Sequence, residues 1–295
     1  MNVVRRPTMP GGPLILDGGL STQLQRMGHD VQGDLWTARL LADDPSSIAS
    51  AHRAFVDAGA DVVITASYQV SRQGFVAAGR TPKDADNALR DSVTAAREAT
   101  LGTAALVAAS VGPYGAVLHD GSEYRGRYGL SHKELRDFHR ERLDILVAAE
   151  PDLLAIETIP DIDEAAALAD VLGDFRHLPV WMTFSAVDDA HVCAGQPIEE
   201  AVAAVAHEVS AVGINCTDAS LITGLLQRMR SVTDAPFVVY PNGGGVWNAE
   251  TGQWVGASGG PFANVDAWRS LGASFIGGCC GTDAEAIRTL VLSAR

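Results

Sequence analysis

Cysteine is scarce in this chain of 295 residues. Only four occur, at positions 193, 216, 279 and 280, and so few thiols cannot form the dense disulfide framework of a small secreted domain. No apolar run approaches the roughly 18 residues that a membrane span needs. The two arginines near the start are not followed by the apolar stretch of a signal peptide. We therefore expect a cytoplasmic protein whose thiols are free or bound to a metal.

The chain also lacks a positive balance of charge. Its 22 basic and 36 acidic side chains give a formal net charge of −14, which opposes binding to nucleic acid or to an anionic membrane. Hydrophobic residues make up 47% of the chain, enough for a large core. A small-molecule substrate, including a cationic one, is the expected partner. The sequence does not indicate the oligomeric state.

Eight short apolar runs recur along the chain. They are apolar throughout rather than alternating, as in parallel strands that are buried on both faces. Segments with helical periodicity lie between them, for example 45–59, 81–102 and 131–150. The predicted strands are 13–19, 61–68, 104–113, 152–160, 179–186, 211–216, 237–244 and 274–282.

Eight repeats of strand and helix predict a (β/α)8 TIM barrel with a core of about residues 13–292. A doubly wound sheet is the alternative, although no Gly-x-Gly-x-x-Gly follows the first strand. No linker divides the chain, so we expect a single domain over residues 1–295. Two long connections, 114–130 and 243–261, follow strand ends on the face where barrels bind substrates, and we expect them to act as lids.

Three of the cysteines stand at the ends of predicted strands. Cys216 closes the sixth strand, and Cys279 and Cys280 close the eighth, so a closed barrel would bring them to one rim. Three thiolates favour an ion such as Zn²⁺ and leave a fourth coordination position for a substrate. Adjacent residues of a regular strand face opposite ways, so both neighbours can bind the ion only if the flanking glycines allow a distortion.

Spacing alone leaves other interpretations open. The three cysteines are equally compatible with small buried core residues or, in an oxidising compartment, with a vicinal disulfide. Cys193 lies in a polar loop beside His191 and has no assigned role. Asp17 and Glu157 end the first and fourth predicted strands and suit the binding of an ammonium group. Their alternatives are a turn or cap residue for Asp17 and an internal ion pair for Glu157.

Several short motifs occur in order between about residues 14 and 290. They are LDGGLSTQL (16–24), TASYQ (65–69), SVGPYGA (110–116), DGSEYRG (120–126), ETIP (157–160), GINC (213–216), YPNGG (240–244) and GGCCGT (277–282). Together they resemble the motifs of the zinc-dependent homocysteine S-methyltransferases, the family that includes betaine–homocysteine methyltransferase. GINC followed by GGCCGT is the most specific part.

The resemblance implies a (β/α)8 barrel in which Cys216, Cys279 and Cys280 are the zinc ligands. It also implies that Asp17 and Glu157 hold the amino group of homocysteine. A thiol bound to zinc loses its proton, and the thiolate is the nucleophile.

The same resemblance assigns four further positions. The backbone around Gly18 and Gly19 would lie near the homocysteine carboxylate, and Asn242 matches a position that can occupy the zinc when substrate is absent. Trp36 matches an aromatic residue near the methyl donor of betaine-using relatives, with core packing as its alternative.

The motifs also bear on the methyl donor. TASYQ lacks the Phe-Tyr pair of the betaine enzymes, and SVGPYGA with DGSEYRG resembles the branch that uses S-methylmethionine or S-adenosylmethionine. The expected reaction is methyl transfer from a sulfonium to homocysteine, giving methionine. Transfer between opposite charges is favoured in a dry site and needs no general base.

Three other functions stay open. One is a different donor, such as betaine, on the same zinc barrel. Another is a zinc-free lyase or aldolase in which residues 277–282 hold a phosphate, although no lysine for a Schiff base stands at a predicted strand end. The third is a zinc-binding barrel without methyltransferase activity.

Overall fold

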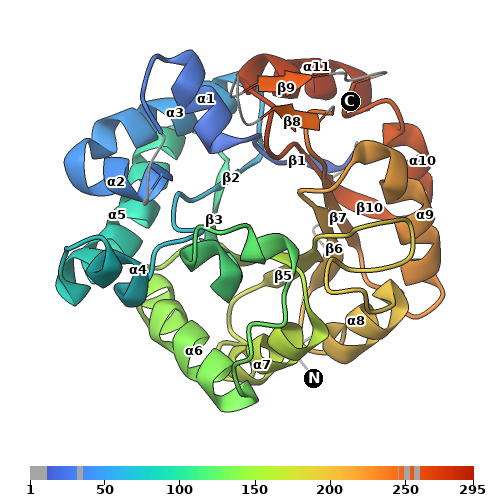
Figure 1. The fold of residues 1–295 in the computed structure, drawn as a ribbon. Coiled ribbons are helices and arrows are strands. Elements are labelled where there is room, and N and C mark those ends of the chain that lie inside the picture. Colours follow the sequence, from blue (N-terminus) through green and yellow to red (C-terminus); the bar gives the residue numbers. More distant parts are fainter. Residues whose placement is uncertain (1–11, 32–35, 245, 249–252, 256–259) are drawn as a thin grey trace.

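The computed structural model describes residues 12–31, 36–244, 246–248, 253–255 and 260–295. Parallel strands form a ring at the centre, and helices surround it (Figure 1). The strands of the ring are β1 (Leu14–Ile15), β2 (Val62–Ile64), β3 (Leu106–Val111), β4 (Leu153–Ile159), β5 (Val180–Phe184), β6 (Ala211–Asn215), β7 (Phe237–Tyr240) and β10 (Ala273–Ile276).

The helices connect successive strands of the ring, and two short 3₁₀ turns follow β3. They are α1 (Leu20–Arg26), α2 (Trp36–Asp43), α3 (Pro45–Ala58), α4 (Arg72–Ala77), α5 (Pro82–Thr100), η1 (Tyr114–Val117), η2 (Ser122–Tyr124), α6 (His132–Ala148), α7 (Ile162–Leu172), α8 (Ile198–Val205), α9 (Ala219–Arg230), α10 (Val265–Ser270) and α11 (Ala284–Ala294). A hairpin of β8 (Val246–Asn248) and β9 (Gln253–Val255) follows β7.

The order of the strands closes the ring. The eight parallel strands are hydrogen-bonded in the order β1-β10-β7-β6-β5-β4-β3-β2. Leu16 then forms a parallel bridge with Val62, and the Asp17 N–H donates to the Val62 carbonyl at 3.1 Å, which joins the end of β1 to β2. The fold is therefore the predicted (β/α)8 TIM barrel. It places the carboxyl ends of all eight strands on one rim.

Local sequence signals explain where the helices begin and end. Thr81 and Ser131 cap α5 and α6 through capping boxes with Asp84 and Glu134, and each box satisfies free backbone N–H groups of the first turn. Gly59 ends α3 with a φ of 104°, a left-handed conformation that glycine adopts without a steric cost.

Two layers of apolar side chains stabilise the barrel. One lies between the strands and the helices, and the other fills the ring itself. Inside the ring, the fully buried Trp181 packs against Tyr240 and Phe275, with ring centroids 6.5 and 5.7 Å away. Because these side chains fill the interior, a site for ligands is left at the rim and not along the axis.

The strands end earlier than predicted. β6 stops at Asn215 and β10 at Ile276, so the cysteines follow these strands and are not their last residues. The 114–130 connection contains η1 and η2, and the β8–β9 hairpin lies within 243–261. Residues 245, 249–252 and 256–259 are outside the described residues, so the action of these connections as lids stays a prediction. No helix in the described part of the chain is long and apolar enough to cross a membrane.

Gly213 provides a test of the barrel packing. A Cβ atom at this position in β6 would lie 1.8 Å from the carbonyl oxygen of Val238 in β7. A small local movement of the Val238 backbone cannot relieve so close a clash. We expect Gly213→Ala to lower the free energy of unfolding in urea by about 3 kcal/mol or more.

Gly173→Ala is the matched control. Gly173 has a φ of −52°, and its nearest neighbouring atom would be 3.4 Å from the new Cβ. The Gly173→Ala substitution should change the free energy of unfolding by less than about 1 kcal/mol. Equal effects of the two substitutions would contradict the packing described here.

Candidate metal centre and active site

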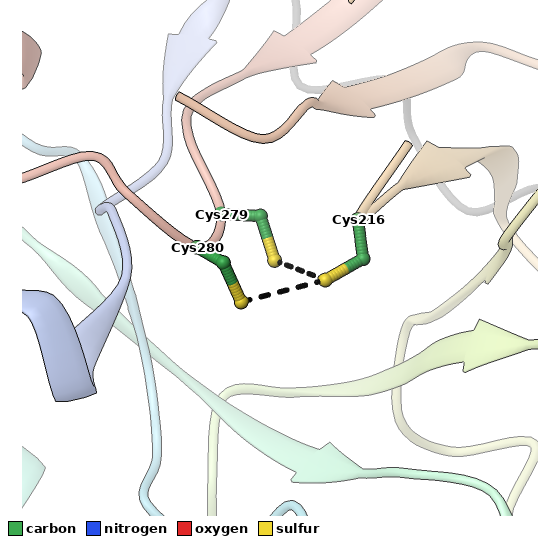
Figure 2. Close-up of side chains that lie close together, drawn as sticks. All are labelled: Cys216, Cys279 and Cys280. Atoms are coloured by element: carbon green, nitrogen blue, oxygen red, sulfur yellow. Dashed lines mark hydrogen bonds between the residues drawn. The ribbon is translucent and has the colours of Figure 1, made fainter. Parts of the chain in front are cut away.

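Three thiols from two distant parts of the chain meet at the carboxyl-terminal rim. The Sγ atom of Cys216, just after β6, lies 2.9 Å from that of Cys279 and 3.7 Å from that of Cys280, both after β10. Figure 2 shows the three side chains pointing toward one another. All three sulfur atoms lie within 4.8 Å of one another, a grouping that could hold one metal ion.

A turn, and not a distorted strand, lets both neighbouring cysteines face Cys216. The Cys279 N–H donates to the carbonyl of Pro241 at 2.8 Å, and the Gly243 N–H donates to the carbonyl of Cys280 at 2.7 Å. The N–H and hydroxyl of Thr282 then donate to the Cys279 carbonyl at 3.1 and 2.6 Å. This corrects the expectation that the two residues lie on the eighth strand, where they would face opposite ways.

Cys216 reaches the cluster from an unusual backbone conformation. Its φ is 49°, and that of Thr158 near the end of β4 is 62°. Residues other than glycine rarely adopt this left-handed backbone conformation, and those that do cluster at functional sites. The side chain of Asn215, the residue before Cys216, holds the Thr158 backbone in place. Its Oδ1 accepts hydrogen bonds from the Thr158 N–H and from the Thr183 hydroxyl, both at 2.8 Å.

The electrostatics of the cluster favour a bound cation. Hydrogen bonds from Cys216 and Cys279 lower the pKa of Cys280 well below that of an ordinary thiol. The same interactions, together with burial, raise the pKa of Cys279 well above it. One thiolate is thus stabilised by two thiols, and full ionisation of all three requires a positive ion between them. Three closely spaced thiolates suit a thiophilic divalent ion.

Two buried carboxylates lie at the same rim. Asp17 is 2% exposed, and its Oδ2 accepts a hydrogen bond from the Ile64 N–H at 2.8 Å. Glu157 is 7% exposed and accepts a hydrogen bond from the Ser110 hydroxyl. Burial raises the pKa of Glu157 to about 7. Burial also raises the pKa of Asp17, and the nearby charge of Glu157 adds to that effect. A ligand ammonium placed between these groups would relieve both penalties.

Of the other predicted positions, Gly19 lies beside the cluster, because a Cβ atom on it would be 2.6 Å from the carbonyl oxygen of Cys279. The Gly19 N–H donates to the Thr282 carbonyl at 2.9 Å, and Gly18 precedes it at the start of α1. The buried Oδ1 of Asn242 has no hydrogen-bond partner in the described part of the chain. Trp36 begins α2, but its side chain is outside what the structure describes. Cys193 is free and does not belong to the cluster.

The structure also reveals contacts that the sequence did not predict. The Tyr124 hydroxyl in η2 lies 3.3 Å from the Sγ of Cys216. The Tyr240 hydroxyl lies 2.8 Å from that of Thr183, below the rim. Tyr124, Tyr240 and Ser110 all belong to motifs noted above, but only the folded chain shows which side chain each one contacts.

Comparison with known proteins places the chain in a family. The sequence profile of the homocysteine S-methyltransferases matches residues 14–293. Homocysteine S-methyltransferase 4 of Zea mays is 41% identical, over 97% of this chain and 90% of the relative. Homocysteine S-methyltransferase YbgG of Bacillus subtilis is 39% identical, over 96% and 94%. The chain belongs to the homocysteine S-methyltransferase family and is a methyltransferase that acts on the homocysteine thiol.

Solved structures agree with this assignment. The metallated form of the homocysteine methyltransferase MmuM from Escherichia coli superposes with a TM-score of 0.85, at 37% identity over 97% of both chains. That structure is of the metallated form, and in this chain Cys216, Cys279 and Cys280 could hold one metal ion. The family assignment also removes the lyase and aldolase interpretations.

The cluster makes a direct prediction about metal content. The purified protein should contain about one thiophilic divalent ion per chain, measured by inductively coupled plasma mass spectrometry. Cys216→Ser and Cys279→Ser should each lose most of this metal, because each removes one of three close thiols. Cys193→Ser is the control and should keep it. Full metal content in the Cys216 variant would exclude the cluster as the site.

Proposed function

We propose that this protein transfers a methyl group from a sulfonium, S-methylmethionine or less favourably S-adenosylmethionine, to homocysteine, with Zn²⁺ held by Cys216, Cys279 and Cys280. The observation that carries the proposal is the meeting of three thiols and two buried carboxylates at one rim. One part of that rim suits a thiol, and the other suits an amino acid ammonium.

Homocysteine carries both of the groups that this arrangement would bind. Asp17 and Glu157 would hold its ammonium, since both are buried and no described cation forms a salt bridge with either. Its sulfur would face the three cysteines. When bound, Zn²⁺ would lower the pKa of the substrate thiol and hold the thiolate at a fixed position. The strands that carry or precede these five residues, β1, β4, β6 and β10, belong to one hydrogen-bonded ring, so the two binding groups keep their spacing.

The transfer conserves atoms and charge in a simple way. The homocysteine thiol gives its proton to solvent on binding. The thiolate then forms a bond to the methyl carbon while the bond from that carbon to the sulfonium breaks, and its electron pair stays on the donor sulfur. With S-methylmethionine, both products are methionine. Opposite charges disappear along this path, so a site that excludes water lowers the barrier.

The DGSEYRG segment supports the choice of a sulfonium donor. This stretch resembles the branch of the family that uses such donors, and in the structure it forms η2, whose Tyr124 contacts Cys216. A segment in this position would face a methyl donor that approaches a thiolate bound beside Cys216. Betaine remains the comparison compound in the assay.

One assay tests the proposed function. We expect the zinc-loaded protein to form methionine from homocysteine with S-methylmethionine at a kcat/KM at least about tenfold above that with betaine, with S-adenosylmethionine between them. Methionine is measured by mass spectrometry with a methyl-labelled donor, and protein without metal is the control. A folded, zinc-loaded sample that is inert with all three donors would refute the proposal.

The raised pKa of Glu157 predicts a pH dependence of ligand binding. Below its pKa of about 7 the carboxyl is protonated and neutral, and an ammonium binds the ionised form. Affinity for methionine, which has no thiol to titrate, should therefore fall about tenfold from about pH 8 to about pH 6. Isothermal titration calorimetry measures this, and Asp17 acts with the same sign.

Glu157→Gln supplies the control for that titration. Glutamine keeps the size of the side chain but cannot ionise, so binding should be weak at both pH values and the slope should shrink. An affinity that rises as the pH falls would show that the carboxylates do not hold the ammonium.

A further inference from the structure

Glu123 is a buried carboxylate without a partner at one of its oxygen atoms. The side chain is 7% exposed, and its Oε2 is buried with no hydrogen bond among the described residues. Burial of an ionised carboxylate is costly unless a cation or hydrogen-bond donors compensate. A carboxylate held in this way is expected where a ligand supplies the missing partner.

Arg125, two residues along the chain from Glu123, is engaged elsewhere. Arg125 donates to the carbonyl and the carboxylate of Asp120 at 2.9 and 3.1 Å, and to the Ser122 hydroxyl at 2.8 Å. No other described cation forms a salt bridge with Glu123. Arg125 is therefore paired with Asp120, and its charge only partly offsets the burial of Glu123, which forms no salt bridge among the described residues.

Glu123 lies beside the metal centre. It precedes Tyr124, whose hydroxyl is 3.3 Å from the Sγ of Cys216, and η2 packs against β4, which carries Glu157. Burial raises the pKa of Glu123, and the charge of the nearby Cys216 raises it further. The Glu123 carboxylate is thus close enough to the cysteine cluster for the charge of Cys216 to raise its pKa.

The backbone around Glu123 is fixed. A Cβ on Gly115 would lie 2.5 Å from the Glu123 nitrogen, so η1 and η2 are in close contact. The two ends of the segment are bound to Glu164 in α7, which accepts from the Tyr114 N–H at 2.6 Å and from the Tyr128 hydroxyl at 3.2 Å. Since the segment is anchored on both sides, the carboxylate is held in place before any ligand binds.

We propose that Glu123 is a methyl-donor-binding residue, with its carboxylate binding a cationic centre of the donor. This inference rests on the proposed function. Asp17 and Glu157 account for the ammonium of homocysteine, and Glu123 is the further buried acid near the cluster. A sulfonium donor brings the positive charge that Glu123 lacks, and a neutral donor would leave it unpaired.

The test uses Glu123→Gln in the zinc-loaded protein. Glutamine preserves shape and removes the charge, so the KM for S-methylmethionine should rise at least about tenfold. The KM for homocysteine should change less than about twofold, since its ammonium binds elsewhere. Glu98→Gln, at an exposed position on α5, is the matched control and should leave both values unchanged.

Stability separates recognition from a structural role. Loss of an unpaired buried charge should leave the urea midpoint of Glu123→Gln equal to or above that of the unchanged protein. A structural carboxylate would lower it. The two sources of positive charge are distinguished with dimethylsulfoniopropionate, a sulfonium without an α-ammonium, measured as a competitor of S-methylmethionine. Weaker inhibition in Glu123→Gln assigns the sulfonium, and unchanged inhibition with a raised S-methylmethionine KM assigns the ammonium.

The outcomes also separate the two proposals. An active unchanged protein with the same donor KM in Glu123→Gln overturns the role of Glu123 and leaves the proposed function standing. An equal rise in both KM values also overturns it. If the unchanged protein is inactive with every donor, the proposed function itself fails.

Discussion

Closure of the parallel sheet is the constraint on which the site depends. Asp17, Glu157, Cys216 and Cys279 are far apart in sequence, and each lies at or just beyond the end of a different strand. The bridge between Leu16 and Val62 completes the ring, so all of these ends lie on one rim. The interior around Trp181 is filled, so these side chains face a ligand at the rim and not along the barrel axis. In this way the sulfur atoms of Cys216 and Cys279, 63 residues apart in the sequence, come within 2.9 Å of each other.

The rim concentrates negative charge, and its chemistry follows from the cations that compensate it. Three thiols share a space that could hold one metal ion, and burial raises the pKa values of Asp17 and Glu157, the two residues that we propose bind an ammonium. In our proposal, the carboxylate of Glu123 binds the cationic methyl donor in the same way. The global charge of −14 is only a background to this local arrangement, because the positions of these groups select the ligands.

Much of the architecture could be predicted from the sequence. Apolar runs and helical segments alternate with a period that defines the barrel, and the caps at Thr81 and Ser131 follow local rules. The rim could not be predicted to the same depth. Whether Cys279 lies on a strand or in a turn depends on hydrogen bonds to Pro241 and Thr282. Tyr124 and Glu123 belong to a loop whose position is set by Glu164 of α7, a contact that carries no local signal.

X-ray absorption at the zinc edge tests the central claim most directly. We expect three sulfur ligands at about 2.3 Å in the zinc-loaded protein and four after addition of homocysteine, since the substrate thiolate would take the position that the cysteines leave open. An unchanged number of sulfur ligands would contradict it, because homocysteine would then bind away from the ion.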